Sequence, residues 1–328
     1  MSTLRAGLLG VGMMGRHHAR VLREVPGVEL VAIADPGGDP HGVAGDLPVL
    51  PDVAALIEAG IDMAVVAVPT RFHEEAALAL AEAGVHTLVE KPIADTVEAG
   101  QRMVDAFASR GLVGAVGHVE RFNPALLEAR RRVADGDLGA VYQIATRRQG
   151  PFPSRIADVG VGKDLASHDI DLTAWVASSR YTNVFGQVAL KSGRPHEDMI
   201  LATGRLENGI IVNHVVNWLS PMKERLTIIT GEKGTFIADT STGDLTFHAN
   251  GTFPLQWESV TAFRGVSEGD MIRYAIQKRE PLRVEHEAFR DAILGEPNEV
   301  VTMEQGLRTL AVVEAVLESA ASGRSVDL

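Results

Sequence analysis

Residues 5–15 read RAGLLGVGMMG, and this stretch decides the fold of the first part of the chain. A short apolar run leads into three glycines, Gly10, Gly12 and Gly15, whose GxGxxG spacing is typical of the strand-to-helix turn that binds a dinucleotide. In such a turn the first glycine permits the bend, the second lets a pyrophosphate approach the main chain, and the third lets the helix pack closely on the strand. The phosphates then lie at the N-terminus of the helix. We predict that the turn contacts a cofactor through five residues: Gly10, Gly12, Met13, Met14 and Gly15.

A carboxylate at the end of the next predicted strand supports the same interpretation. Asp35 follows Gly15 by 20 positions, where an acidic side chain accepts hydrogen bonds from the adenosine ribose hydroxyls. Its charge would repel a 2′-phosphate, and the three residues that follow, PGG, supply no arginine to hold one. We therefore predict NAD rather than NADP. The alternative is an ordinary α/β turn with an unrelated acidic cap.

The first third of the chain alternates short β-branched runs with alanine-rich segments whose apolar residues recur at three and four positions. This alternation is typical of βαβ units around a parallel sheet that is covered on both faces. The predicted strands cover residues 5–10, 28–35, 62–68, 85–90 and 111–117, and the predicted helices cover residues 14–24, 71–83 and 95–109. We therefore predict an α/β fold that begins with an NAD-binding Rossmann domain over residues 1–120.

From about residue 120 the pattern changes. After one predicted helix, several runs alternate polar and apolar residues, which indicates an antiparallel sheet with one covered face. The helix covers residues 120–136, and the runs cover residues 141–148, 183–190, 199–206, 210–219, 225–231 and 235–239. Three more helices are predicted over residues 268–278, 285–295 and 304–323, the last closed by Gly323. Residues 121–328 are thus predicted to form an α+β domain with a large, mostly antiparallel open sheet, whose last helix can pack back on the first domain.

The composition excludes several classes of protein. A formal net charge of -12 opposes attraction to nucleic acid and to anionic lipid. The chain contains no cysteine, which excludes disulfides, thiolate catalysis and cysteine-ligated zinc or iron-sulfur sites, and no other metal ligand set is evident. The apolar stretch at the start is too short and too glycine-rich for a membrane span and lacks a cleavage-site pattern. We expect a cytoplasmic protein with no metal, nucleic acid or membrane partner.

Two further motifs carry groups suited to proton transfer. Lys91, in VEKP, follows the fourth predicted strand, at the edge where an open α/β sheet binds ligands. A buried ammonium group there can hold charge that develops on a substrate oxygen, whereas the alternative is an ordinary surface lysine. In DLASHDID, Asp164 and His168 are four positions apart, so that any helix they share presents them on one face. His168 can then act as a general base oriented by Asp164, or the pair can ligate a metal or serve only as a capping acid and a packed polar residue.

Basic residues close to this pair are candidates for substrate binding. Arg147, Arg148 and Arg155 flank a Pro-rich loop just before it, where they can hold an anionic part of the substrate or face solvent. Lys163 immediately precedes Asp164 and has the same two interpretations. By contrast, the arginine run at residues 130–132 is predicted to be a solvated helix face.

Together these motifs resemble the Gfo/Idh/MocA family, which includes glucose-fructose oxidoreductase and myo-inositol dehydrogenase. The resemblance covers essentially the whole chain and rests on GVGMMGRHHAR, AVPTRFHEEAALALAEAGVHTLVEKPIADT, GHVERFNP and DLASHDIDLTAW. Its most specific part is the combination of EKP with DxxxHDID. The resemblance implies that Lys91, Asp164 and His168 take part in proton transfer while a hydride passes to the nicotinamide of NAD.

The resemblance also implies the positions of further cofactor contacts. Residues matching the family's cofactor cleft are Pro69, Thr70, His73, Glu90 and Lys91, and His118 matches the nicotinamide end. In relatives the bond between the EKP lysine and its proline is often cis, an isomer that proline tolerates at modest cost. The Pro/Gly-rich segment 36–51 departs from the family, because it abbreviates the helix that usually follows the second strand.

Within the family, several stretches look like the UDP-N-acetylglucosamine 3-dehydrogenases, which oxidise the sugar 3-hydroxyl to a ketone. These stretches are GHVERFNP, RRQGPFPSRIADVGVGKDLASHDID and NWLSPMKERLTIITGEKGTF. We therefore expect a dehydrogenase of a nucleotide sugar, with a dehydrogenase of a free sugar or cyclitol as the alternative. A dinucleotide-sensing regulator on the same fold is a third possibility, against which the retention of Lys91, Asp164 and His168 speaks. Family habit and an exposed sheet face favour a homodimer or homotetramer.

Overall fold

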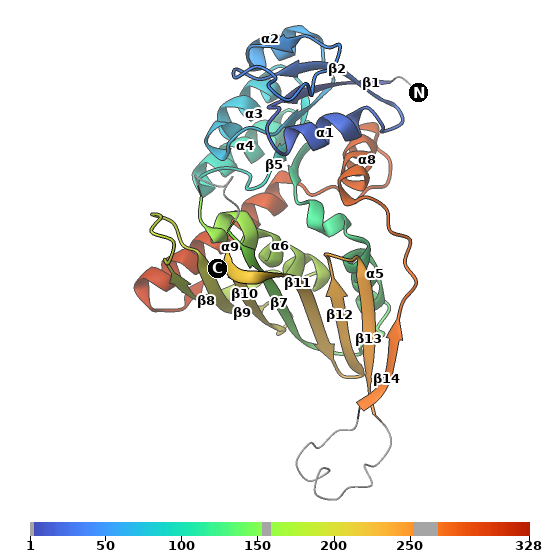
Figure 1. Ribbon diagram of the computed structural model, residues 1–328, viewed down its shortest axis with the longest axis vertical. Coiled ribbons are helices and arrows are strands. Elements are labelled where there is room, and N and C mark those ends of the chain that lie inside the picture. The colour runs from blue at the N-terminus through green and yellow to red at the C-terminus, as the bar shows by residue number, and fades with distance from the viewer. Residues whose placement is uncertain (1–2, 153–158, 252–267) are drawn as a thin grey trace, which may run out of the picture. The chain divides into compact units, whose positions relative to one another are not determined.

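The computed structural model describes residues 3–152, 159–251 and 268–328. The chain divides into two compact units, of which the first comprises Met1–Val119 and Glu280–Ala311 and the second Glu120–Arg279 and Val312–Leu328. Figure 1 shows the elements of both units. In the described part of the chain, no helix is long and apolar enough to cross a membrane.

A parallel sheet of six strands forms the centre of the first unit. Its strand order is β3-β2-β1-β4-β5-β6, which is the strand order of a Rossmann fold and confirms the prediction. The strands are β1 (Leu4–Leu9), β2 (Val28–Ala34), β3 (Val49–Leu50), β4 (Met63–Val66), β5 (His86–Glu90) and β6 (Gly114–Gly117). Most residues of β1, β4 and β5 are buried, as expected for a sheet that helices cover on both faces.

Helices cover this sheet on two faces. One hydrophobic core includes residues of α2 (Val53–Glu58), α3 (His73–Glu82) and α4 (Val97–Ser109). The other includes residues of α1 (Gly15–Leu22) and of α8 (Pro281–Leu294), which pack side by side (Figure 1). The helix α8 therefore places residues from near the C-terminus beside the helix that follows the glycine-rich turn.

The segment after β2 has the abbreviated form predicted from its composition. Residues 36–48 form turns and contain no helix. The short elements β3 and α2 follow, and the sequence analysis missed both because two and six residues are too few to show a period.

A nine-stranded sheet forms the second unit, in the order β14-β13-β12-β11-β7-β10-β9-β8-β15. Strands β7 and β10 pair parallel, and the other described neighbours pair antiparallel, which confirms a large, mostly antiparallel sheet. The strands are β7 (Val141–Pro151), β8 (Tyr181–Ala189), β9 (Met199–Leu206), β10 (Ile211–Asn217), β11 (Leu219–Gly231), β12 (Gly234–Asp239), β13 (Asp244–Asn250), β14 (Glu268–Arg273) and β15 (Val326–Asp327).

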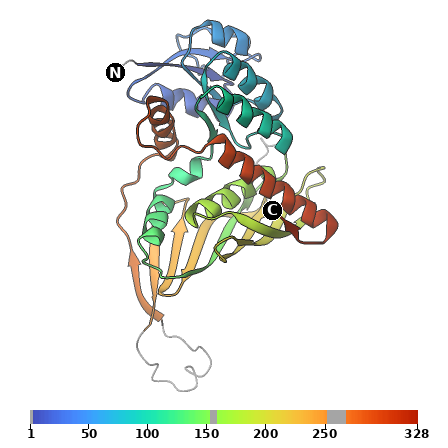
Figure 2. The ribbon, with the colours of Figure 1, turned by 180° about the vertical axis from the view of Figure 1, so that it is seen from behind.

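Helices α5 (Pro124–Ala134) and α6 (Ser167–Val176) pack against this sheet (Figure 2). The second half of α9 (Met303–Ser322) contributes Val312, Val313 and Val316 to the same core. Among the shorter turns, η2 (Val119–Phe122) precedes α5 and η3 (Gly162–Ala166) leads directly into α6.

The helix predicted over residues 268–278 is wrong. Residues Glu268–Arg273 form the strand β14, which pairs antiparallel with β13 at the edge of the sheet. Met271 and Ile272 are adjacent in sequence, so the segment shows no alternation and its local pattern does not indicate a strand. Pairing with β13 is a long-range contact that overrides local preference. The sequence analysis also missed β13 itself.

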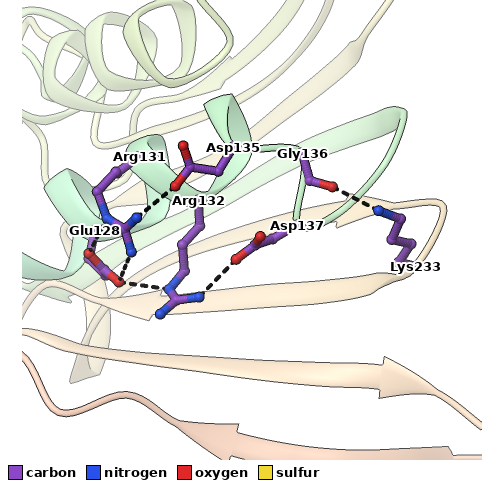
Figure 3. A network of polar contacts seen from close by, with 7 residues as sticks. All are labelled: Glu128, Arg131, Arg132, Asp135, Gly136, Asp137 and Lys233. Atoms are coloured by element: carbon purple, nitrogen blue, oxygen red, sulfur yellow. Dashed lines mark hydrogen bonds and ion pairs between the residues drawn. The ribbon is translucent and has the colours of Figure 1, made fainter.

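The arginine run on α5 is only partly the solvated face that the sequence predicted. Arg131 is largely exposed and pairs with Glu128 and Asp135, whereas Arg132 pairs with Glu128 and Asp137 (Figure 3). The guanidinium group of Arg132 also lies 3.5 Å from the ring centre of Tyr274, and that of Arg130 lies 4.6 Å from the ring centre of Trp175. These contacts tie α5 to its neighbours in the second unit.

Candidate active site

The predicted cofactor contacts of the first unit follow the carboxyl ends of its parallel strands. These ends meet at one edge of a parallel sheet, which is the edge where open α/β sheets bind ligands. The glycine-rich turn follows β1, Asp35 follows β2, Pro69 and Thr70 follow β4, Lys91 follows β5, and His118 follows β6. The fold thus brings these residues, far apart in sequence, to the same edge of one sheet.

The three glycines of the turn have the geometry that a dinucleotide requires. Gly10 has a φ of +96°, and a Cβ added to it would lie 2.7 Å from the carbonyl oxygen of Ala67. A Cβ on Gly15 would lie 2.0 Å from the carbonyl oxygen of Gly10, so helix and turn pack too closely for any side chain there. A Cβ on Gly12, by contrast, would meet no atom within 4 Å. Gly10 and Gly15 are required by the fold, and the open space beside Gly12 fits the approach of a pyrophosphate.

Asp35 is fixed beside this turn by the main chain. Its Oδ2 accepts a hydrogen bond of 2.9 Å from the N–H of Val11, and its Oδ1 accepts one of 2.8 Å from the N–H of Gly37. An ionised carboxylate has about four acceptor positions, so each oxygen retains capacity for a ribose hydroxyl. The position of Asp35 therefore fits the binding of an NAD ribose.

Replacing Asp35 with alanine is expected to weaken NAD binding by about 10- to 100-fold, because a hydrogen bond to a charged group contributes about 1.5–3 kcal/mol. NADP binding should change much less, since the same carboxylate repels the 2′-phosphate. Calorimetric titration of both cofactors measures the change. Asp35→Asn keeps an acceptor for the Val11 N–H and controls for damage to the turn. Tighter binding of NADP than of NAD by the unmodified protein would contradict the assignment.

Three of the predicted cofactor contacts lie between the end of β4 and the first turn of α3. Thr70 begins the short helix η1 (Thr70–Phe72), and Pro69 immediately precedes it. His73 is buried, and its two ring nitrogens lie 3.0 Å from the carbonyl oxygen of Pro92 and 2.9 Å from that of Val68. Burial lowers the pKa of His73. This histidine therefore ties the chain after β4 to the segment that contains Lys91, whereas its contact with a cofactor stays a prediction.

The EKP motif lies at the end of β5. Glu90 is buried, and its side chain contacts the imidazole of His18 and the main-chain N–H of Lys91. The Lys91-Pro92 peptide bond is cis, which agrees with what the family resemblance implies. His118 is also buried and follows β6 directly. The main chain of Lys91 is thus held to the buried side chain of Glu90.

In the second unit, Asp164 and His168 lie in one continuous helical segment that contains a π-helical turn. The turn is η3, in which the N–H of Ser167 bonds to the carbonyl oxygen of Gly162, five residues earlier. Asp164 is buried within it, and His168 lies half-buried in the first turn of α6. Single π turns within helices are rare and occur frequently at functional sites. The sequence predicts the helix but not this widened turn.

The start of this segment depends on a residue that the sequence analysis missed. Glu197 precedes β9, and its Oε1 accepts a hydrogen bond of 2.8 Å from the N–H of Gly162. A Cβ on Gly160 would lie 2.1 Å from the same oxygen, so only glycine leaves room for the carboxylate. No local signal could identify Glu197, because it lies 35 residues from the turn that it caps.

Two buried ion pairs hold α6 in place around His168. Arg148 of β7 donates to Asp169 at 2.7 Å and to Glu120 at 3.1 Å. Arg121 of η2 donates to both oxygens of Asp171, at 2.7 and 2.6 Å. Burial raises the pKa of Asp169, and the neighbouring Arg148 opposes that rise. The two aspartates of HDID therefore position the helix.

The predicted substrate arginines do not form one cluster. Arg148 is buried and engaged by two carboxylates, so the structure gives it a structural role. Arg147 is its neighbour on β7 and points to the opposite face of the sheet, where it is half exposed and lies 3.2 Å from Glu224. The structure thus separates Arg147 from the side chains that hold α6. Arg155 lies outside the described residues, and Lys163 is 3.6 Å from Glu314.

Nothing in the described residues suggests a metal centre at this pair. No group of three or more His, Cys, Asp or Glu side chains there is arranged to hold a metal ion. The metal-ligand interpretation of Asp164 and His168 therefore gains no support from the described part of the chain.

Comparison with known proteins adds a family context. The model of the GFO_IDH_MocA oxidoreductase family, NAD-binding Rossmann fold, matches residues 4–118, and that of the family's C-terminal alpha/beta domain matches residues 130–328. UDP-N-acetylglucosamine 3-dehydrogenase of Acidithiobacillus ferrooxidans is 32% identical over 65% of this chain and 66% of its own length. The NAD(+)-dependent scyllo-inositol 2-dehydrogenase of Bacillus subtilis is 31% identical over 56% of each chain.

These two sequence alignments span less than two thirds of the length of the curated relatives. The structural likeness is more extensive. A solved structure of the UDP-N-acetylglucosamine 3-dehydrogenase from Acidithiobacillus ferrooxidans superposes with a TM-score of 0.84 and 26% identity, covering 98% of this chain and 99% of that one.

Proposed function

The chain belongs to the Gfo/Idh/MocA family of NAD-binding oxidoreductases, and from this premise we propose that it oxidises the 3-hydroxyl of a UDP-N-acetylhexosamine. The observation that carries the catalytic part of the proposal is the position of Lys91. It follows β5 directly, at the sheet edge that also holds the glycine-rich turn and Asp35. A lysine at this edge is suited to stabilise charge on the oxygen of the reacting alcohol.

The proposed mechanism assigns one task to each of three side chains. The glycine-rich turn and Asp35 would hold NAD, which would supply the acceptor for the hydride of the carbinol carbon. The neutral imidazole of His168 removes the hydroxyl proton, and Asp164 in the preceding turn keeps that imidazole basic and oriented. The ammonium group of Lys91 donates a hydrogen bond to the substrate oxygen, which develops negative charge as its proton leaves. Asp169 and Asp171 do not take part, because buried arginines hold both of them.

The nucleotide-sugar part of the proposal rests on similarity. The UDP-N-acetylglucosamine 3-dehydrogenase described above is alike over nearly both whole chains, and a diphosphate would need a cationic contact such as Arg155. A free sugar or cyclitol is the second candidate substrate. The inositol dehydrogenase relative favours it, and so does the structural role of Arg148.

Arg155→Ala is expected to raise KM for UDP-N-acetylglucosamine by about 10- to 100-fold while NAD binding stays nearly unchanged, since a charge-assisted contact to phosphate contributes about 1.5–3 kcal/mol. The measurement is NAD reduction with a panel of UDP-sugars, free sugars and inositols. Arg273→Ala is the matched control, because Arg273 is a largely exposed arginine of β14 that pairs with Asp244. Turnover of inositols but not of UDP-sugars would favour the second candidate.

We also propose that the chain forms a homodimer or homotetramer through the open face of its second sheet. Strands β8 and β9 present Phe185 and Leu201 there, which are 38% and 42% exposed. Apolar side chains in a broad sheet face are typical of an interface between copies. Sedimentation equilibrium at micromolar concentration tests this, and a monomer mass would contradict it.

A further inference from the structure

A column of buried ionisable side chains runs from α8 through α1 to the end of β5. The Nε2 atom of His18 lies 2.8 Å from Oε1 of Glu90, and its Nδ1 atom lies 2.8 Å from Nε2 of His286. The second oxygen of Glu90 accepts the main-chain N–H of Lys91 at 3.1 Å. His18 is fully buried, and Glu90 and His286 are 8% and 1% exposed. These contacts thus connect α8, α1 and β5 to the main chain of Lys91.

The column carries its negative charge on Glu90. Burial opposes this charge, but the hydrogen bond and the charge interaction with His18 hold the pKa of Glu90 below its ordinary value. Burial lowers the pKa of His286 well below its ordinary value, so this imidazole is neutral. Burial also raises the pKa of Glu285 well above its ordinary value, and the charge of Glu90 adds to the rise. These surroundings therefore favour the ionised form of Glu90 and the neutral forms of Glu285 and His286.

At Lys91 and Pro92, main-chain groups make hydrogen-bond contacts with side chains. Pro92 has no N–H, so of these two residues Lys91 alone has a main-chain donor. This N–H donates to the carboxylate of Glu90. His73 contacts the carbonyl oxygen of Pro92 from the other side, at 3.0 Å. On β6, a Cβ added to Gly117 would lie 3.3 Å from the Glu90 carboxylate, so this strand packs directly against it. Glu90 therefore has little freedom once His18 is in place.

We propose that His18 and His286 are positioning residues for Lys91: they hold Glu90 ionised and fixed, and Glu90 fixes the main chain from which the lysine side chain extends. This inference rests on the role proposed for Lys91 above. It differs from a purely structural role, in which the column would only join α1 to α8. A structural role predicts a loss of stability alone, whereas positioning predicts a loss of turnover that depends on the charge of Glu90.

The pH dependence of a variant without His18 follows from the groups around Glu90. Removing His18 removes the main interactions that lower the pKa of Glu90, so this pKa rises, and the carboxylate becomes protonated as the pH falls. The loss of turnover should then be larger at low pH than at high pH. The ionisable groups that face Glu90 are His18 of α1, His73 of α3, Lys91 after β5, and Glu285 and His286 of α8.

The test compares His18→Leu with His18→Gln. His18→Leu is expected to lower kcat by about 10- to 100-fold, with KM for the sugar nearly unchanged and with a deeper loss at pH 6 than at pH 8. The glutamine amide can still donate to Glu90, so His18→Gln should restore most of the turnover. Hydrogen exchange of the Lys91 amide gives a readout without activity, and it should be faster in His18→Leu and near normal in His18→Gln.

Two further variants keep the result decisive. His86→Leu removes a partly buried histidine at the other end of β5, whose Nδ1 accepts the N–H of Val113, and it should leave kcat unchanged. Glu90→Gln keeps the shape of the side chain and removes its charge, so it carries the test if His18→Leu does not fold. Equal turnover of His18→Leu and the unmodified protein would overturn the positioning role, as would equal losses in the leucine and glutamine variants. Lys91→Met, assayed in parallel, separates this failure from failure of the proposed function, which would leave Lys91→Met fully active.

Discussion

His168→Asn is expected to lower kcat for alcohol oxidation by about 10²- to 10⁴-fold, the usual contribution of a positioned general base. Asparagine matches the size of the imidazole approximately but does not accept a proton at neutral pH. NAD affinity should change little, because His168 belongs to the second unit and the cofactor contacts predicted here belong to the first. Stopped-flow measurement of NADH formation at saturating substrate, with NAD titrated separately, checks both expectations.

The same variant should lose the acid limb of the pH profile. Oxidation requires neutral His168, so the rate of the unmodified enzyme should rise with pH as this imidazole loses its proton. The buried His214 cannot produce this limb, because burial lowers its pKa to about 4 and keeps it neutral throughout. His248→Asn, an exposed histidine on β13, is the matched control. An unchanged rate and profile in His168→Asn would show that the base lies elsewhere.

Lys91→Met is expected to lower kcat by about 10²- to 10³-fold, because methionine has nearly the length of lysine but cannot donate a hydrogen bond to the developing alkoxide. KM for the sugar should change less than kcat. If both groups act on one proton transfer, the double variant Lys91→Met/His168→Asn should be less impaired than the product of the single effects predicts. Lys278→Met, a surface lysine beside Asp244, serves as the control. Independent, multiplicative losses would contradict a shared step.

The first unit could be predicted from the sequence because its signals are local. Each strand from β1 to β6 except β3 lies in a run that the sequence predicts as a strand, and most predicted cofactor contacts lie at or just after the end of a strand. Periodicity and glycine spacing record such features within a dozen residues. The second unit depends more on long-range pairing. The local sequence of β14 therefore predicts a helix, and only its pairing with β13 makes it a strand.

The substrate arginines and the histidine column show the same limit at single residues. Arg147 and Arg148 are adjacent, and only the covering of β7 on one face decides which of them is buried. His17 and His18 are adjacent on α1, yet His17 is exposed and His18 is buried. The partners of His18, however, are 72 and 268 residues away in sequence. No spacing rule identifies contacts at such separations.

The hydrogen bonds from Val11 and Gly37 to Asp35 have a consequence for how tightly NAD binds. They immobilise the carboxylate, and the close packing of Gly10 and Gly15 immobilises the turn, before any ligand arrives. The conformational entropy of these groups is therefore lost when the chain folds, and it does not oppose the binding of the dinucleotide. Such preorganisation lowers the entropic cost of binding NAD at this end of the site.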